Sequence, residues 1–438
     1  MDLKKKVSSI TSMFPGPFWV ANIMELFERL AYYGQATILS LFLRDHLKLS
    51  EIEAGQLSSV FGGLIYLLPI FAGALADKFG FRKAFSTAFG GLTIGYFLIG
   101  SMGMNMFRGI YSGFPVYWLL FIILIFTAMA GSFIKPSVLG TVAVTSTHET
   151  KSLGYAIYYW LVNTGAAIGP FLAYLVRDRI GISSVYLVSA ISCALMFITT
   201  RIFFKEPLVH NQSQDKGILE IAADILKVLL NFRFIIFLLL FGLYWMLFWQ
   251  FFIIVPFYVS DFISPDAPIE LIISAGAWTI ILLQLPINRL TKKIPTQTAI
   301  LIGFILAASC WLMWFFALPA VGSGKIMFLG SEWYAGNIVL IAGIVMFSIG
   351  EQIQAPRFYE YIADMAPSGQ AALFQGYAFL PIAIAWGFGG TFGGWIYQKY
   401  ATTAKDPQSI FMILFMVGAA ASVGMMLYNI LFIRRKSA

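Results

Sequence analysis

Apolar segments and short polar stretches alternate along the whole chain. The segments are about 20 to 30 residues long, which is enough for an α-helix to cross the hydrocarbon core of a bilayer. Many of them contain no charged residue, as is typical of membrane spans. Twelve spans are predicted, at residues 18–43, 54–76, 84–104, 115–145, 152–177, 183–204, 234–260, 269–290, 297–319, 336–362, 370–397 and 408–432.

A polar stretch divides these spans into six before it and six after it. Within that stretch, residues 217–230 carry apolar positions at helical spacing, which predicts an interfacial amphipathic helix. Six spans on either side of one linker is the arrangement of many secondary transporters. The pattern predicts an N-terminal six-helix bundle at 1–204, a cytoplasmic linker at 205–232 and a C-terminal six-helix bundle at 233–438.

The composition agrees with an all-α polytopic membrane protein. Of the 438 residues, 59% are hydrophobic and 11% are charged, and the mean hydropathy is +0.81. The net charge of +8 does not indicate nucleic-acid binding, because most lysines and arginines lie in one set of alternate loops and at the termini. That asymmetry orients membrane helices and predicts that both termini face the cytoplasm. We expect a multi-pass protein of the inner or plasma membrane, in contact with the lipid bilayer.

The sequence contains no pattern for a metal or a bound cofactor. Cys193 and Cys310 lie within apolar segments, and the histidines His46, His148 and His210 lie in or near loops without ligand spacing. The absence of a phosphate-binding loop of the type Gly-x-x-x-x-Gly-Lys-Ser/Thr argues against ATP as the energy source. We therefore expect no cofactor, and no Ser/His/Asp constellation suggests an enzyme.

The first predicted span carries an unusual polar side. Glu25, Glu28 and Arg29 are three or four residues apart, so a helix places them together, and Tyr32 and Tyr33 extend that side by one turn. Charges inside a span are costly and need partners or water. The stretch indicates either an ion pair that serves packing alone or the lining of a path for substrate and protons.

The loop between the second and third spans contains a specific motif. It reads Gly73-Ala-Leu-Ala-Asp77-Lys-Phe-Gly80-Phe-Arg82-Lys83. Gly73 allows a close helix approach, Gly80 allows a turn, and Asp77 can pair with basic residues or cap a neighbouring helix. The loop resembles the signature loop of the major facilitator superfamily, which implies a twelve-helix fold of two six-helix bundles. By this resemblance, Gly73, Asp77, Gly80 and Arg82 act in conformational change and not in substrate binding.

Four stretches in different spans form a second set. They are Glu25-x-x-Glu28-Arg29-Leu30-x-Tyr32-Tyr33-Gly34 in the first span, Lys135-Pro136 in the fourth, Tyr158-Tyr159-Trp160-Leu161-Val162-Asn163-Thr164-Gly165 in the fifth, and Glu351 with Ala355-Pro356 in the tenth. Together they resemble the proton-dependent oligopeptide transporter family, of which this chain looks like a divergent relative.

The resemblance implies roles for these residues. Lys135 and Glu351 pair across a cavity, and protonation of Glu351 or a competing substrate carboxylate releases that gate. Arg29 and Lys135 attract the carboxyl end of a substrate, and Glu351 attracts its amino end. Alternatives are a Lys135 that snorkels to the membrane surface, and packing or lipid-facing roles for the aromatic residues. The implied proton-coupling and gating residues are Glu25, Glu28, Arg29, Lys135 and Glu351, and the implied cavity lining is Arg29, Tyr32, Tyr33, Tyr66, Lys135, Asn163, Trp245 and Glu351.

The chain also departs from that family. Trp249 occupies the position of an acidic residue in the seventh span, and the asparagine expected in the eighth span is absent. These departures put the family's coupling scheme in question. Arg357 adds a charge to the tenth span, and its spacing predicts a pair with Glu360 or Asp364 rather than with Glu351. The substrate would be more anionic than a simple peptide if Arg357 faced the cavity.

The expected function is proton-coupled symport of a small solute, most naturally a di- or tripeptide, by a monomer that uses the proton gradient as its energy source. The main alternative is a proton-driven exporter of drugs, metabolites, organic anions or lipids. Gly165-Ala-Ala-Ile-Gly169-Pro170 partly resembles a motif of drug/proton antiporters, although small residues four apart also serve close helix packing. A lipid-modifying enzyme and a non-transporting receptor or scaffold are weaker alternatives.

Overall fold

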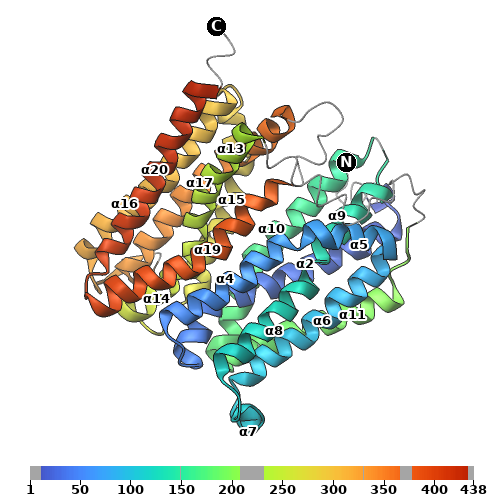
Figure 1. The fold of residues 1–438 in the computed structure, drawn as a ribbon, viewed down its shortest axis with the longest axis horizontal. Helices are drawn as coiled ribbons and strands as arrows, with labels where there is room; N and C mark the ends of the chain where they lie inside the picture. The colour runs from blue at the N-terminus through green and yellow to red at the C-terminus, as the bar shows by residue number, and fades with distance from the viewer. Residues whose placement is uncertain (1–10, 148, 208–230, 329, 366–376, 433–438) are drawn as a thin grey trace. The chain divides into compact units, whose positions relative to one another are not determined.

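The computed structural model describes residues 11–147, 149–207, 231–328, 330–365 and 377–432, and these are predominantly α-helical (Figure 1). Eleven of the described helices are long and apolar enough to cross a membrane. The remaining predicted span is α2 (Gly16–Ala36), whose 21 residues include Glu25, Glu28 and Arg29. The prediction of an all-α polytopic protein with twelve spans is therefore confirmed.

The N-terminal spans begin and end close to their predicted limits. Pro69 occupies the first turn of α5, and Pro136 lies in the first turn of α9, where a missing N–H costs no hydrogen bond. The elements after α2 are α3 (Leu39–Leu41), η1 (Phe42–His46), α4 (Glu51–Leu67), α5 (Pro69–Phe79), α6 (Phe81–Met102), η2 (Asn105–Phe107), α7 (Arg108–Tyr111), α8 (Val116–Gly131), α9 (Ile134–Thr145), α10 (Lys151–Arg179) and α11 (Ile182–Ile202).

The C-terminal spans also match, and one added feature is a β-hairpin that the hydropathy pattern did not predict. In the hairpin, Lys325 pairs with Tyr334 and Ile326 with Trp333, in antiparallel register. The elements are α13 (Phe232–Trp249), η3 (Gln250–Phe252), α14 (Ile254–Tyr258), η4 (Val259–Ile263), α15 (Ile269–Thr291), α16 (Thr296–Val321), β1 (Lys325–Phe328), β2 (Ser331–Tyr334), α17 (Ala335–Met365), η5 (Tyr377–Phe379), α19 (Leu380–Ile396), η6 (Tyr397–Thr403) and α20 (Gln408–Phe432).

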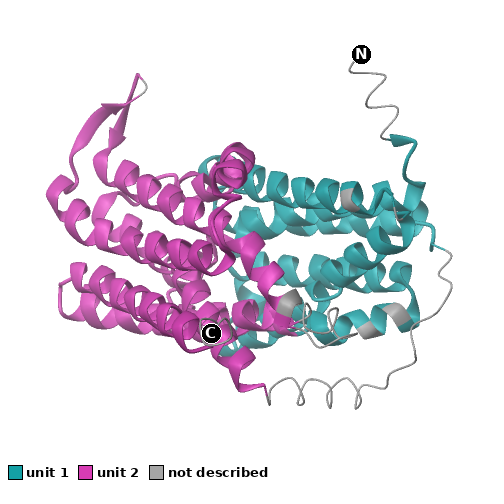
Figure 2. Cartoon of the chain, turned by 90° about the horizontal axis from the view of Figure 1, so that it is seen from above, with its two compact units in different colours: residues 1–35, 68–221 teal, residues 36–67, 222–438 magenta. Residues whose placement is uncertain are grey.

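The chain divides into two compact units (Figure 2). Unit 1 comprises residues 1–35 and 68–221, and unit 2 comprises residues 36–67 and 222–438. In unit 1, α6 packs on α8 and α11; in unit 2, α16 packs on α17 and α20, and α4 packs along α19.

These units do not coincide with the predicted bundles 1–204 and 233–438, because α4 is counted with the C-terminal helices. The reason is a glycine-lined contact between α4 and α19. A Cβ at Gly63 would lie 2.9 Å from the Cα of Gly387, so the two backbones are nearly in contact. The bundle boundaries stay a prediction, and the predicted amphipathic helix of the linker lies outside the described residues.

Candidate functional site

A buried charged cluster lies on α2 in unit 1. Glu25, Glu28 and Arg29 are only 0%, 1% and 3% exposed. The Arg29 guanidinium forms ion pairs with both carboxylates, and its Nε lies 3.3 Å from Oε1 of Glu25. The guanidinium carbon also lies 4.9 Å from the centre of the Tyr32 ring. One buried cation is thus held by two carboxylates and an aromatic face.

The close approach of α10 to α2 encloses this cluster. A Cβ at Gly165 would lie 2.5 Å from the Cβ of Arg29, and one at Gly169 would lie 2.6 Å from the carbonyl oxygen of Leu30. Neither position has room for a larger side chain. The two glycines of the partial antiporter motif therefore have a described role in helix packing.

Lys135 joins the cluster from α9. Its side chain is half-buried and interacts electrostatically with Arg29, Glu25 and Glu28. A Cβ at Gly73 would lie 3.4 Å from the Cβ of Pro136, so the signature-loop helix α5 reaches the start of α9. With Lys135, the described cluster consists of two cations and two carboxylates, so its charges offset one another.

The remaining predicted residues of unit 1 lie on the same two helices. Tyr32 is buried and Tyr33 is half-buried, and their rings meet edge to face at 5.2 Å between centroids. The Asn163 side chain is half-buried on α10, and its Nδ2 donates a 2.8 Å hydrogen bond to the carbonyl oxygen of Tyr159. The Asn163 amide is thereby oriented by its own helix.

Unit 2 contains a carboxylate, that of Glu351, without an ion pair to a described residue of its unit. Glu351 is half-buried on α17, and within its unit no described side chain forms an ion pair with it. Tyr244 and Tyr359 interact with it electrostatically. On α13, the half-buried Trp245 packs edge to face on Phe248, and its indole nitrogen has no hydrogen-bond partner among the described residues. Glu351 is therefore a candidate for neutralisation by a proton or a ligand cation.

An aromatic stack occupies the place of the expected acidic residue. The rings of Trp249 and Trp386 lie 3.6 Å apart at 20°, and Tyr66 packs against both, at 5.7 Å and 6.0 Å. These side chains join α13, α19 and α4. Trp249 is buried, so this position contributes apolar packing in unit 2 and no charge.

Arg357 pairs as its spacing predicted. Its Nη1 lies 2.9 Å from Oε2 of Glu360, and its Nη2 donates to the carbonyl oxygen of Lys292 at 3.3 Å. The side chain of Asp364, the other predicted partner, lies outside the described part of the chain. Arg357 is thus held at the end of α15, and this contact gives no support for an anionic substrate.

The signature loop makes the predicted turn. Gly80, with a φ of +92°, ends α5 and precedes α6. The backbone N–H groups of Phe81 and Arg82 each donate a 2.7 Å hydrogen bond to the carboxylate of Glu206, and Arg82 also donates to the carbonyl oxygen of Arg201. Glu206, more than 120 positions away, therefore caps α6. The side chain of Asp77 is outside the description, so its predicted role is untested.

A second charged group, which the sequence did not single out, lies at the ends of two spans in unit 2. The Arg44 guanidinium donates to both carboxylate oxygens of Asp261, at 2.9 Å and 2.8 Å, and Tyr397 donates to the same carboxylate at 2.7 Å. Asp45 also pairs with Arg44. From the sequence, only the pair of the adjacent Arg44 and Asp45 was predictable, because Asp261 is 217 residues away from Arg44.

The described residues contain no group of three His, Cys, Asp or Glu side chains arranged to hold a metal ion. Cys193 and Cys310 are both buried and unpaired as thiols.

These features can now be set beside known proteins. The family model of the Major Facilitator Superfamily matches residues 22–329, which is more than half of the chain. The chain belongs to the Major Facilitator Superfamily. Its family and its matched relatives are transporters, and it is a multi-pass membrane protein.

The expected resemblance to oligopeptide transporters is also confirmed. Dipeptide and tripeptide permease A of Serratia proteamaculans is 24% identical over 203 residues, which cover 46% of this chain and 38% of the permease. Dipeptide and tripeptide permease B of Shigella dysenteriae is 27% identical over 175 residues, 39% of this chain and 34% of the permease. The matched part of the chain thus spans little more than a third of the length of these relatives.

Solved structures resemble the chain over nearly all of its length. A POT family transporter in complex with 5-aminolevulinic acid superposes with a TM-score of 0.73 at 18% identity, covering 95% of this chain and 96% of that one. A nucleoside transporter superposes with a TM-score of 0.71 at 14% identity, covering 94% and 99%. Both similarities show the major facilitator fold alone, and they do not identify a substrate.

Proposed function

We propose that this protein is a secondary transporter that moves di- and tripeptides, or peptide-like solutes, by proton-coupled symport through alternating access. The observation that carries this proposal is the charged cluster of unit 1, in which the half-buried Lys135 joins the buried Glu25, Glu28 and Arg29. Ionisable groups held at membrane depth are expensive, and they mark substrate or proton pathways by default. The named activity of the two matched permeases supports a peptide as the cargo.

A peptide suits these groups because it is a zwitterion. Its carboxylate would bind at Arg29 and Lys135, which offer directional donors to an anion. Its ammonium group would bind at Glu351, which has no ion pair within its unit among the described residues. The pairing of Lys135 with Glu351 stays a prediction.

Coupling would then depend on protonation of a carboxylate. Trp249 stands where the related family has an acidic residue, so that proton acceptor is missing here. The candidate proton acceptors in this chain are Glu25, Glu28 and Glu351. Glu351 is the strongest of the three, because the other two already share Arg29. A proton or a substrate ammonium can each satisfy Glu351, and this competition would link the two fluxes.

Uptake in proteoliposomes tests the proposal. With an inward proton gradient, we expect accumulation of labelled dialanine above equilibrium and its loss with a protonophore. Dialanine amidated at its C-terminus or acetylated at its N-terminus should compete poorly, because each lacks one charged end. Gradient-driven efflux without peptide uptake would replace this proposal with the exporter alternative.

We further propose that the protein acts as a monomer in the cell membrane with both termini cytoplasmic, and we propose no catalytic activity or cofactor. Lysine and arginine asymmetry in the loops supports that orientation. Cysteines can be introduced at Gly113, in the loop before α8, and at Lys151, the first residue of α10. Both positions are exposed and lie on opposite predicted sides, whereas the native Cys193 and Cys310 are buried. A membrane-impermeant maleimide should label Gly113→Cys in intact cells and Lys151→Cys only after lysis. The reverse result would invert the orientation.

A further inference from the structure

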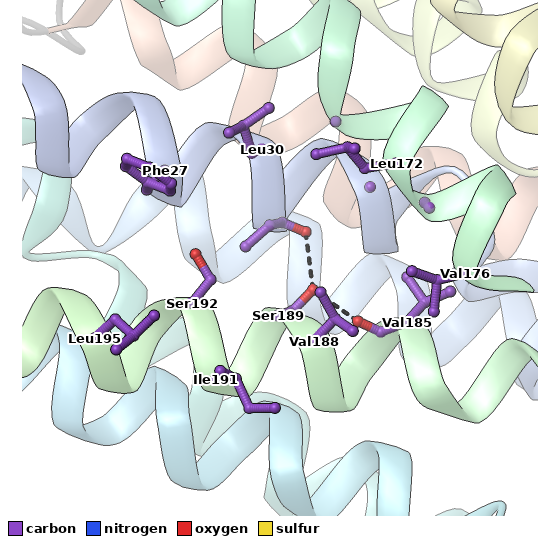
Figure 3. Close-up of a pocket in the computed structure, with 14 residues that line it drawn as sticks. Phe27, Leu30, Leu172, Val176, Val185, Val188, Ser189, Ile191, Ser192 and Leu195 are labelled. Carbon is purple, nitrogen blue, oxygen red and sulfur yellow. Dashed lines mark hydrogen bonds between the residues drawn. The ribbon is translucent and has the colours of Figure 1, made fainter. Parts of the chain in front are cut away.

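An apolar groove lies between α2, α10 and α11 in unit 1 (Figure 3). It encloses about 260 Å³. An apolar cavity of about 150 Å³ is already enough to hold a benzene molecule. The groove therefore has room for several methylene groups of an extended hydrocarbon.

Small residues on all three helices create this space. Ala31 and Gly34 lie on α2, Gly169 and Ala173 on α10, and Ser189 on α11. A Cβ at Gly34 would lie only 3.2 Å from the carbonyl oxygen of Gly169, so α2 and α10 approach each other at the backbone. Larger side chains form the walls, and Figure 3 shows Leu172 and Val176 from α10 facing Val185 and Val188 from α11.

The groove offers almost no polar partner. No charged residue lines it. The Ser189 hydroxyl already donates to backbone carbonyl oxygens, that of Val185 at 3.0 Å and that of Ala31 at 3.4 Å. Ser192 supplies the only other hydroxyl among the lining residues. Water or a charged solute would lose hydrogen bonds on entering, whereas a hydrocarbon chain would lose none.

The groove is lined by two candidate membrane spans and by exposed apolar side chains. Its α10 and α11 residues lie within the spans Leu153–Arg179 and Ile182–Ile202. At its rim, Ile191 and Leu195 are 60% and 54% exposed, as is typical of side chains that face acyl chains in a membrane protein. The length and hydropathy of these two spans therefore predict that acyl chains border the groove.

We propose that this groove binds one acyl chain of a membrane phospholipid, an inference that goes beyond the transport function. The bound chain would contact the back of α2, where Phe27, Leu30 and Ala31 alternate with the charged cluster on the opposite side. A lipid tail seated there supports the helix that carries Glu28 and Arg29.

Photo-crosslinking tests this inference. The full chain is reconstituted in liposomes of phosphatidylethanolamine and phosphatidylglycerol, with a trace of phosphatidylethanolamine that carries a diazirine in one acyl chain. Crosslinks mapped by mass spectrometry should be several-fold more frequent at Leu172 and Ile191 than at Ile94. Ile94 is a fair reference because it is 52% exposed on α6 and does not line the groove.

A variant that fills the groove, compared with a matched variant elsewhere, completes the test. Figure 3 shows Ser192 pointing from α11 toward α2, so Ser192→Trp should reduce the crosslinks at Leu172 several-fold, while Ile94→Trp should not. If Ser192→Trp does not fold, Ala173→Leu is the second variant. Equal crosslinking at all exposed positions would mean bulk lipid only, and crosslinks to a second protein copy would mean a protein interface; either result overturns the proposal. The measurement needs no transport activity, so it fails or succeeds independently of the proposed function.

Discussion

At the scale of the residue, the buried and half-buried carboxylates of the two units differ in whether they form an ion pair. Glu25 and Glu28 share the guanidinium of Arg29 in a nearly solvent-free environment. Glu351 has no ion pair within its unit among the described residues, although two tyrosines lie within electrostatic reach. A half-buried carboxylate without a cation is costly as an anion, so it favours a bound proton or a bound ammonium group. From this difference we propose that Glu351 is the carboxylate that exchanges a proton for a ligand cation, whereas Glu25 and Glu28 stay paired with Arg29.

The prediction for Glu351 follows directly. Glu351→Gln should lower proton-driven peptide accumulation by about tenfold or more, the size of a typical coupling between two ligands. Exchange of labelled for unlabelled peptide without a gradient should continue, because the amide keeps a hydrogen-bonding oxygen. Glu360→Gln is the control, since Glu360 lies on the same helix and pairs with Arg357. Undiminished accumulation in Glu351→Gln would exclude Glu351 as the coupling group.

At the scale of the element, close packing between α4 and α19 depends on glycine. A Cβ at Gly390 would lie 2.5 Å from the carbonyl oxygen of Gly55 and 2.9 Å from the backbone nitrogen of Ser59. Ser59 Oγ also accepts a 2.8 Å hydrogen bond from the backbone N–H of Thr391. Backbone atoms move aside less easily than a flexible side chain, so a side chain at Gly390 would force the two helices to shift.

Two alanine substitutions on α19 should therefore differ in their effect on stability. Gly390→Ala should lower the free energy of unfolding by about 1 to 3 kcal/mol through overpacking. At Gly387, a Cβ would lie 3.8 Å from the Cα of Gly63, an ordinary contact. Gly387→Ala should leave stability unchanged or raise it by up to about 1 kcal/mol through helix propensity. Thermal unfolding in detergent measures both, and equal losses would contradict the contact described.

The cap of α6 gives a second prediction for an element. Glu206→Ala removes the acceptor of two charge-assisted hydrogen bonds, so we expect a loss of about 1 to 2 kcal/mol in stability. Lys205→Ala changes the neighbouring exposed residue and should have little effect. The same thermal unfolding assay compares the two variants. A stable Glu206→Ala protein would show that water replaces the cap at no cost.

At the scale of the whole molecule, segments distant in sequence are joined by a few polar contacts. In unit 2, Arg44 follows the first span and Asp261 lies at the end of the seventh, and they pair bidentately with Tyr397 as a third partner. Arg44 is 9% exposed in this pair and Asp261 is 36% exposed. Partial burial makes such a pair stronger than one on the open surface.

A double-mutant cycle measures this connection. Arg44→Ala combined with Asp261→Ala should give a coupling energy of about 1 kcal/mol or more. The hairpin pair Lys325–Glu332 is the matched comparison, because its side chains are 46% and 62% exposed at a similar distance of 2.9 Å. Its coupling should be about 0 to 1 kcal/mol. Equal couplings would contradict the role we assign to burial.

The sequence by itself determined the features that depend on near neighbours in the chain. The spans were predictable because a helix in lipid satisfies its backbone within its own segment, so length and hydropathy are sufficient signals. The Glu25–Arg29 and Arg357–Glu360 pairs follow from helical spacing, and the turn at Gly80 follows from the freedom of glycine at positive φ.

Only the tertiary structure decided the contacts between distant segments. Three such contacts join residues more than 100 positions apart: the cap that Glu206 forms on α6, the Arg44–Asp261 pair, and the stack of Trp249 on Trp386. The groove behind α2 likewise exists because small residues of three helices meet at one place. Hydropathy cannot encode these meetings, because helices in lipid are equally apolar on many faces and packing alone selects which faces touch.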